Sequence, residues 1–271
     1  MRTVAVLTVD IRVPHYARTA YTIEREFSRR GYEVILCNTG GDRAETLRYL
    51  QVVNQKQVDG IVLVGSVFDT ICQGAEMEKL LTGVPVVLAN GKLDLPNAYS
   101  VTVDDKYGVS LAVEHLVARG RKNIYYIKDR DTDSAKSKRD GFLEAMRRNG
   151  LEFADHVLEA GETLASGMET VQALLAQGIV PDGIVCGEDL TAAGALKALL
   201  RAGLRVPGQV AVVGFNNSDY AHLCEPVLTS IDNKPEQVAL LCVQLLESSI
   251  ERSEAYSSVV LQPELAQGET S

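Results

Sequence analysis

One arrangement recurs along the chain and restricts its fold: an amphipathic helix, a glycine, and then a short apolar strand. The glycines that end these predicted helices are Gly31, Gly83, Gly120, Gly150, Gly178 and Gly203. Glycine closes a helix in the left-handed conformation, which a Cβ atom would penalise. Strands and helices that alternate with short connections predict parallel sheets joined by right-handed crossovers. We therefore expect an α/β fold.

The segments after these glycines are β-branched and apolar, which is typical of strands buried on both faces of a parallel sheet. The predicted strands include residues 4–9, 33–37, 60–64, 85–89, 123–127, 183–186 and 210–215. Helix N-caps are expected at Asp42, which has Glu45 at capping-box spacing, and at Asp105 and Ser134. Pro235 occupies a first-turn position of a helix predicted over 235–251.

The chain is expected to form two lobes and to pass between them three times. Residues 100–103 form a second extended piece soon after the strand at 85–89, with no helix between them, as a crossing segment would. Residues 228–234 are predicted to cross back, and a third crossing is placed near Ser257. The predicted N-terminal lobe comprises residues 1–103 and 232–257, and the predicted C-terminal lobe comprises residues 104–231 and 258–271.

Charge and cysteine content restrict the partners and the compartment. The chain has 27 basic and 36 acidic residues, a formal net charge of −9 and no long Lys/Arg run, so these residues are not expected to bind DNA tightly. The five cysteines form no CxxC or Cys/His metal spacing, and Cys37, Cys186 and Cys242 lie in apolar runs, which indicates buried, reduced thiols. The sequence shows no signal peptide and no 18-residue apolar run. We expect a cytoplasmic protein without membrane contact.

Residues 206–231 carry the most specific pattern in the chain. Val-Pro-Gly leads into the apolar strand 210–215, which ends in Asn216-Asn217-Ser218-Asp219, and Glu225-Pro-Val-Leu-Thr-Ser-Ile231 resumes an extended path. Polar groups just past the carboxyl end of a buried parallel strand are where open α/β sheets bind ligands. In order and spacing, the stretch resembles the lactose/galactose-repressor (LacI/GalR) family of bacterial transcription regulators, which usually has paired aspartates at the two asparagines. The resemblance covers residues 3–268.

The resemblance implies a periplasmic-binding-protein-like core of type I: two similar lobes, each a parallel sheet flanked by helices, joined by three crossover strands. It implies a small-molecule effector, a sugar or related metabolite, that binds between the lobes and shifts their arrangement and so the DNA affinity of the intact protein. It also implies a homodimer. The apolar helix faces around 47–53 and 71–81 are compatible with a dimer, although such faces also pack on their own sheet.

Family members carry a helix-turn-helix module before the first strand, and this sequence begins at that strand. Either the module has been removed or the protein never had one. Contact with operator DNA is therefore expected only through an N-terminal module that this chain lacks.

In the N-terminal lobe, the candidate effector-binding residues follow predicted strands. His15 and Tyr16 follow the first strand, where a ring can stack on a sugar or base. Tyr16 alternatively packs at the start of its helix. Ser66 and Phe68 follow the third strand. Asn90 follows the fourth, at a position that resembles a ligand carboxylate of the family, and a turn-forming role is its alternative.

In the C-terminal lobe, the candidates are Lys138, Glu188, Asp189 and Asn216. Lys138 resembles an arginine that clamps the effector, but it offers a point charge instead of a planar fork. Its alternatives are a solvated helix face and a ligand role for the adjacent Arg139. Glu188-Asp189 stands where the family commonly has Asn-Asp, and Asp189 alternatively caps its helix. Asn216 replaces an aspartate that takes sugar hydroxyls. These departures weaken the expectation of an ordinary neutral sugar.

Signals for enzymes, cofactors and metals are lacking. Asp129-x-Asp131-x-Asp133 is similar to the start of a calcium loop, but its sixth position is Ser134 instead of glycine and its twelfth is Asp140. The sequence contains no GxGxxG, P-loop, GxSxG or HExxH motif. We expect no cofactor, no metal and no enzymatic activity. The alternative function is a solute-binding receptor of a transport system, which would require export.

Overall fold

The computed structural model describes residues 2–252 and 257–271, and the chain divides into two compact units. Unit 1 comprises the chain up to Val103 and Lys234–Leu261, and unit 2 comprises Asp104–Asn233 and Gln262–Ser271. The chain therefore passes between the units three times. Residues 258–261, predicted for the C-terminal lobe, lie in unit 1, because the strand Val259–Leu261 pairs with the first unit's sheet. Residues 232–233, predicted for the N-terminal lobe, lie in unit 2.

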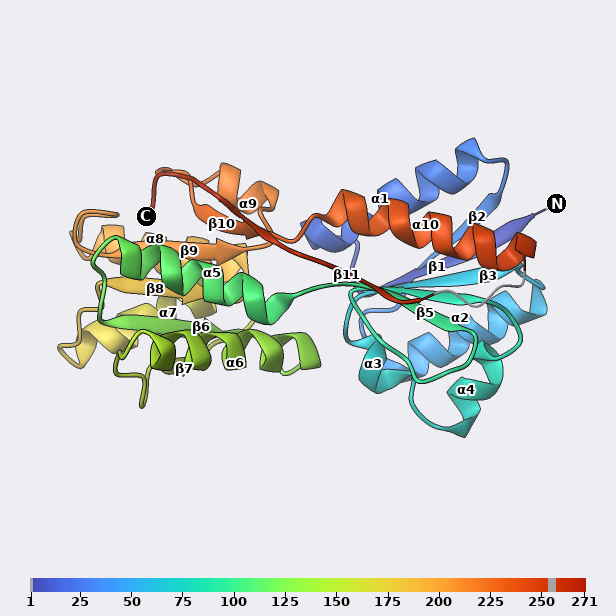
Figure 1. The fold of residues 1–271 in the computed structure, drawn as a ribbon, viewed down its shortest axis with the longest axis horizontal. Coiled ribbons are helices and arrows are strands. Elements are labelled where there is room, and N and C mark those ends of the chain that lie inside the picture. The colour runs from blue at the N-terminus through green and yellow to red at the C-terminus, as the bar shows by residue number, and fades with distance from the viewer. Residues whose placement is uncertain (1, 253–256) are drawn as a thin grey trace. The chain divides into compact units, whose positions relative to one another are not determined.

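Unit 1 is a six-stranded parallel sheet with helices on both faces (Figure 1). Its strand order is β11-β5-β4-β3-β1-β2. The strands are β1 (Thr3–Thr8), β2 (Glu33–Asn38), β3 (Gly60–Val64), β4 (Val86–Ala89), β5 (Ala98–Val103) and β11 (Val259–Leu261). One face carries α1 (Pro14–Arg29) and α10 (Pro235–Arg252), and the other carries α2 (Arg43–Gln55), α3 (Phe68–Ile71) and α4 (Ala75–Leu81).

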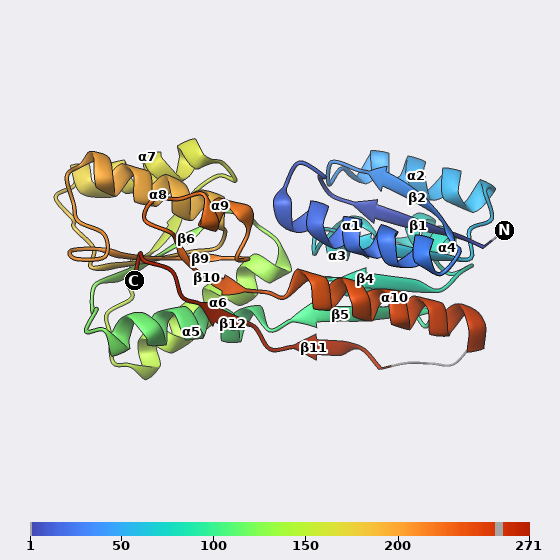
Figure 2. The same cartoon turned by 90° about the horizontal axis from the view of Figure 1, so that it is seen from above.

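Unit 2 repeats this topology with a second six-stranded sheet, in the order β12-β10-β9-β8-β6-β7. All its pairs are parallel except β10 with β12. The strands are β6 (Ile124–Lys128), β7 (Val157–Glu159), β8 (Gly183–Cys186), β9 (Ala211–Phe215), β10 (Thr229–Asp232) and β12 (Glu264–Ala266). One face carries α5 (Asp105–Ala118) and α6 (Asp133–Arg148), and the other carries α7 (Leu164–Ala176), α8 (Asp189–Arg201) and α9 (Asp219–His222) (Figure 2).

The glycines that were expected to end helices mostly do so in the left-handed region. Five of the six have positive φ, from 65° at Gly150 to 82° at Gly120. Gly83 is the exception, because it follows the C-cap residue Thr82 of α4 in the same way but does not have a positive φ. The alternation of helix, glycine and strand therefore predicted the order of the elements correctly.

The predicted N-caps are right at Asp42, whose side chain accepts a backbone N–H of the first turn of α2, and wrong at Asp105 and Ser134. Asp104 and Thr132 cap α5 and α6 instead. Asp105 and Ser134 lie inside the two helices and bond to each other, with the Ser134 hydroxyl donating to the Asp105 carboxylate at 2.6 Å. This bond ties α5 to α6.

All five cysteines are free thiols, and Cys37, Cys186 and Cys242 are buried as predicted. Burial raises the pKa of the Cys72 thiol to about 12, so this buried thiol stays protonated at neutral pH. Over residues 2–252 and 257–271, no helix combines the length and apolar character needed to cross a membrane.

Candidate functional site

Tyr16 lies in the core of unit 1 at the start of α1. Its side chain is 7% exposed and its ring centroid is 4.0 Å from that of His15. A Cβ atom on Gly65 would lie only 3.0 Å from the Tyr16 ring, so the glycine makes room for this ring. The geometry supports the packing alternative for Tyr16, and an effector contact of His15, which is half-buried, stays a prediction.

The other unit 1 candidates differ in exposure. Phe68 is fully buried, so its side chain serves the core of unit 1. Ser66 and Asn90 are half-buried, and Asn90 adopts a left-handed φ of 59° directly after β4, as its turn-forming alternative requires. The neighbouring Asp69 carboxylate accepts the backbone N–H of Lys92 at 2.7 Å and so fixes the loop that contains Asn90. Effector contacts of Ser66 and Asn90 stay predictions.

Lys138 on α6 lies buried at the carboxyl end of the sheet of unit 2. It is 8% exposed, its Nζ donates to the Gly187 carbonyl at 2.9 Å, and this nitrogen lies 3.8 Å from the centroid of the Phe215 ring. The alternative of a solvated helix face is therefore wrong for Lys138. It fits the neighbouring Arg139 better, because its side chain is 41% exposed and pairs with Asp140 at 2.8 Å.

A chain of hydrogen bonds ends on Glu188. Asn233 Nδ2 donates to Asn216 Oδ1 at 2.7 Å, and Asn216 Nδ2 donates to Glu188 Oε2 at 2.6 Å. Asn216 is 4% exposed and has a φ of 98°, in the left-handed region that asparagine tolerates better than most residues. Because both ends of its amide are bonded within the protein, Asn216 orients the Glu188 carboxylate.

Asp189 is fully buried, and both of its carboxylate oxygens accept bonds from the protein. One oxygen accepts from the Ser218 amide at 2.7 Å and the Ser218 hydroxyl at 2.8 Å, and the other accepts from the Ser230 hydroxyl at 2.6 Å. Burial raises the pKa of Asp189 to about 7, against these three bonds, which lower it. The capping alternative is wrong, because Glu188 is the N-cap residue of α8. The geometry gives Asp189 the role of tying α8 to β10 and to the loop after β9.

Asp129 is a site residue that the sequence reasoning missed. It directly follows β6 and is 7% exposed. Burial and the nearby Glu188 raise the pKa of Asp129 to about 6, while Lys138 and Arg130 act in the opposite direction. The sequence contained a signal for this residue, because Asp129 is an acidic residue directly after a buried strand. The calcium-loop interpretation of Asp129, Asp131 and Asp133 did not use that signal.

The charges around Lys138 are mainly negative. Arg130 lies 3.2 Å from the Glu162 carboxylate and 3.9 Å from that of Glu188. Burial raises the pKa of Asp105, although Lys138 and the Ser134 hydroxyl lower it. In the described part of the chain, no cluster of His, Cys, Asp and Glu has the arrangement of a metal site. The largely buried side chains of Lys138, Glu188 and Asn216 form a cluster that offers ammonium, carboxylate and amide groups to a small molecule.

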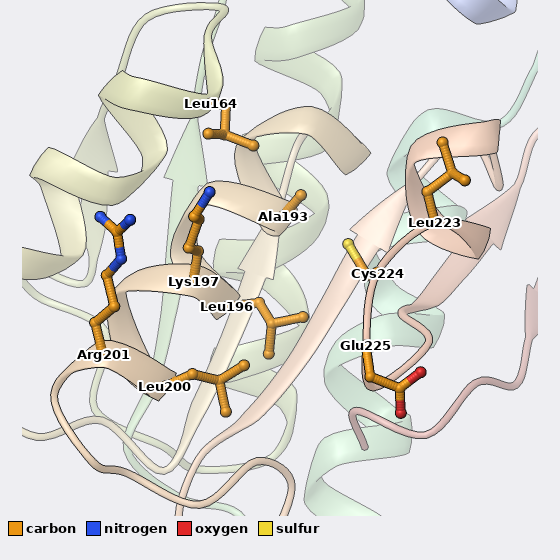
Figure 3. Close-up of a pocket in the computed structure, with 9 residues that line it drawn as sticks. All are labelled: Leu164, Ala193, Leu196, Lys197, Leu200, Arg201, Leu223, Cys224 and Glu225. Carbon is orange, nitrogen blue, oxygen red and sulfur yellow. The ribbon is translucent and has the colours of Figure 1, made fainter.

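A separate groove of about 500 Å³ lies on the surface of unit 2, between α8 and the segment after α9 (Figure 3). Leu223 on one side of it is 81% exposed and Leu200 on the other is 42% exposed. The full lining consists of Leu164, Ala193, Leu196, Lys197, Leu200, Arg201, Leu223, Cys224 and Glu225. Two cations lie on the α8 side, and Glu225 lies on the opposite side (Figure 3).

Comparisons with known proteins agree with this architecture. The family described as "Periplasmic binding protein-like domain" matches residues 113–271. A helix-turn-helix (HTH)-type transcriptional regulator of Lachnoclostridium phytofermentans is 31% identical over 249 residues, which cover 91% of this chain and 75% of that protein.

Solved structures show the same fold. The transcriptional regulator CelR in complex with cellobiose has a TM-score of 0.85 and 25% identity, over 99% of this chain and 84% of that one. A lac repressor dimer bound to operator and an anti-inducer has a TM-score of 0.88 and 21% identity, over 99% of this chain and 81% of that one. The chain therefore belongs to the LacI/GalR family of transcriptional regulators and comprises its periplasmic-binding-protein-like, effector-binding core.

Proposed function

We propose that this core senses a small polar molecule through the buried cluster at the carboxyl end of the sheet of unit 2, with Lys138, Glu188 and Asn216 as its central residues. The observation that carries the proposal is the burial of Lys138 beside the Gly187 carbonyl and the Phe215 ring. Burying an ammonium group is costly unless its partners are fixed. A fixed ammonium and a fixed carboxylate next to each other suit the recognition of a polar ligand.

The mechanism that we propose is a population shift. The core exists in two states, and the ligand binds one of them more tightly, which changes the DNA affinity of the intact protein. Moving the equilibrium from 1:99 to 99:1 requires a difference of about 5.5 kcal/mol in ligand binding between the states. The DNA contact itself belongs to a helix-turn-helix module, as the names of the relatives indicate.

A binding role is favoured over an enzymatic one by the chemistry of the side chains. The Lys138 nitrogen is engaged by a carbonyl and an aromatic face, so it is not placed as a nucleophile. The buried thiols have raised pKa values, as at Cys72. For a regulator of this kind we propose a cytoplasmic location, in preference to the export that a transport receptor needs.

We propose that the groove of unit 2 binds a second copy of this chain. An exposed leucine such as Leu223 is costly in water, and the groove carries Lys197 and Arg201 opposite Glu225. A patch with both signs of charge can be complementary to itself, as a two-fold symmetric interface requires. The helix faces suggested for a dimer by the sequence are less suited, because Leu50 and Leu81 are fully buried in unit 1.

The dimer proposal is tested by Leu223→Asp. We expect light scattering with size-exclusion chromatography to show a dimer for the unaltered chain and mainly monomer for the variant, because a charge would be buried in an apolar interface. Tyr21→Asp, at a 60% exposed site on α1, is the matched control and should remain dimeric. A monomer for the unaltered chain at high concentration would contradict the proposal.

The sensing proposal is tested by thermal shift with sugars, sugar phosphates, nucleosides and amino acids. A ligand at 100 times its Kd should add about 2.7 kcal/mol to the stability of the folded state. We expect this gain to disappear in Lys138→Met and to persist in Arg139→Ala, a change at the adjacent residue, whose side chain is 41% exposed. An equal gain in both variants would contradict the assignment of Lys138.

A further inference from the structure

Asp129 is a buried carboxylate with few hydrogen bonds. The bond that it accepts from another side chain, that of Thr191, is 3.5 Å long, whereas Asp189 accepts three bonds of 2.8 Å or shorter. Two carboxylates of similar burial at the same end of one sheet are thus satisfied to different extents. A buried carboxylate gains more from a further donor than one whose oxygens are already filled.

The hydroxyl of Tyr126 lies beside Asp129. It is fully buried and has no hydrogen-bond partner among the described residues. The position that a Cβ atom would take on Gly187 lies 2.8 Å from Asp129 Oδ1 and 3.1 Å from the Tyr126 oxygen, so the two groups converge on this glycine. Both groups thus pack against the backbone of Gly187, which brings two incompletely satisfied polar groups together, and a donor that contacts both would satisfy both.

The cations of this region are already engaged. Lys138 donates to Gly187 and faces the Phe215 ring, and Arg130 lies between two carboxylates. The carboxylates around them are Asp105, Asp129, Glu162 and Glu188. With all groups ionised, the negative charges outnumber the positive ones. An anionic ligand would be repelled, and a cationic donor would be attracted.

We propose that the effector is a small hydroxylated amine, an amino sugar or amino-polyol, whose protonated amino group binds Asp129 and Tyr126 and whose hydroxyls bind Glu188 and the N–H donors of Lys138 that the Gly187 carbonyl does not use. This inference rests on the proposed sensing function and names the ligand class. Hydrogen bonds between an ammonium and a carboxylate are about twice as strong as neutral ones. The Glu188 carboxylate, oriented by Asn216, accepts hydroxyl protons as paired acceptors do in polyol recognition.

The inference predicts a specific pH dependence. Asp129 faces Tyr126 on β6, Lys138 on α6, and Glu188 and Thr191 next to or on α8, with Arg130 beside it on its own segment. Because the pKa of free Asp129 is raised to about 6, an ammonium ligand must displace its proton below that pH. Affinity for the amine should therefore rise from pH 5 to pH 7, about tenfold per unit at the steepest.

The test is isothermal titration of the chain with matched pairs: glucose and glucosamine, galactose and galactosamine, mannose and mannosamine, glycerol and 2-amino-1,3-propanediol. The hexose 6-phosphates serve as anionic members. We expect at least one amine to bind about tenfold or more tightly than its neutral partner. Asp129→Asn should remove that preference and its pH dependence, and Tyr126→Phe should reduce it several-fold.

The control variant is Glu169→Gln, which alters an exposed carboxylate on α7 and should keep the preference for amines. Melting temperatures of all variants without ligand show whether each is folded. If neutral sugars or phosphates bind and their amine counterparts do not, the amine inference is overturned while the sensing function stands. If no member of any class binds or shifts the melting temperature of the folded chain, both are overturned.

Discussion

The two units have the same strand order, yet the carboxylates at the ends of their strands behave in opposite ways. In unit 1, Asp10 lies after β1 and accepts hydrogen bonds from the exposed Arg12, which hold its pKa below the usual range. In unit 2, burial raises the pKa values of Asp129 and Asp189. The same topology thus places a carboxylate paired with an exposed arginine at a strand end of unit 1 and buried carboxylates at the strand ends of unit 2. The buried carboxylates supply the chemistry of the candidate site.

The difference extends to the neutral side chains. At the strand ends of unit 1, the aromatic candidates Tyr16 and Phe68 pack into the core. At those of unit 2, an aromatic ring, that of Phe215, carries a buried ammonium group on its face. Substitutions at the strand ends of unit 1 should therefore act mainly through packing, and those at the strand ends of unit 2 mainly through charge and polar contacts.

Phe68→Ala is expected to have the largest effect on stability. Removing a fully buried phenylalanine costs about 3–5 kcal/mol through lost burial and a residual cavity. Urea unfolding monitored by circular dichroism should show this loss. Tyr21→Ala, at an exposed position on α1, should change stability by less than about 0.5 kcal/mol. A loss below about 1 kcal/mol for Phe68→Ala would contradict its role in the core and make Phe68 a candidate ligand contact again.

Asp189→Ala is expected to cost about 2–3 kcal/mol, because it leaves the buried donors of Ser218 and Ser230 without an acceptor. The same urea unfolding experiment measures the loss. Asp219→Ala, an exposed acid on the neighbouring α9, is the matched control and should cost less. Equal effects of the two changes would mean that the three bonds to Asp189 contribute nothing to stability.

Much of the fold was predictable because its signals are local. A helix, its closing glycine and the apolar strand after it are contiguous, so the order of the elements could be read directly from the chain. The third crossing was predicted, but its position was not, because β11 is only three residues long and its place depends on pairing with β5, far away in sequence.

The site was less predictable, because its contacts are distant in sequence. The donors to Asp189 lie 29 and 41 residues away, so no spacing rule separates its role in the fold from a ligand role. The burial of Lys138 depends on the Gly187 carbonyl, 49 residues away. Asp129 could have been predicted, because the rule that polar residues directly after a buried parallel strand bind ligands selected Asn216 after β9 and applies equally to the residue after β6.

Between pH 6.5 and 8, Asp189 is expected to make the stability of the chain depend on pH. The folded-state pKa, about 7, is raised above the reference value of 3.8, so the folded state holds a proton that the unfolded state has lost. The contribution is fully present below the unfolded pKa, declines by up to about 1.4 kcal/mol per unit between 3.8 and 7, and is gone above about 8, so the last ~0.8 kcal/mol of the loss falls between pH 6.5 and 8. Urea unfolding across this window should show the slope.

Asp189→Asn should flatten this slope, whatever its effect on absolute stability. His115 acts in the opposite direction and at lower pH, because burial lowers its pKa to about 4 from a reference of 6.5. Its contribution is present above 6.5 and is lost as pH falls through 4, so it does not interfere above pH 6.5. An unchanged slope in Asp189→Asn would assign the dependence to another group.

Asp129→Asn is expected to have the smallest effect on the chain without ligand, a change of at most about 1 kcal/mol in the free energy of unfolding at pH 7.5. The amide keeps the shape of the side chain and one oxygen that can accept either the 3.5 Å bond from Thr191 or a backbone bond, and it removes a charge that Glu188 repels. The loss of attraction to Lys138 offsets part of that relief.

The same substitution should have a large effect on ligand binding, and this contrast is what separates Asp129 from Asp189. Asp189 then stabilises the fold and makes no contact with the ligand, while Asp129 contributes little to the stability of the fold and binds the ligand. Urea unfolding and titration with the bound ligand, performed on one preparation, measure both effects. A loss of more than about 2 kcal/mol in Asp129→Asn without ligand would make Asp129 a second structural acid and remove the distinction between them.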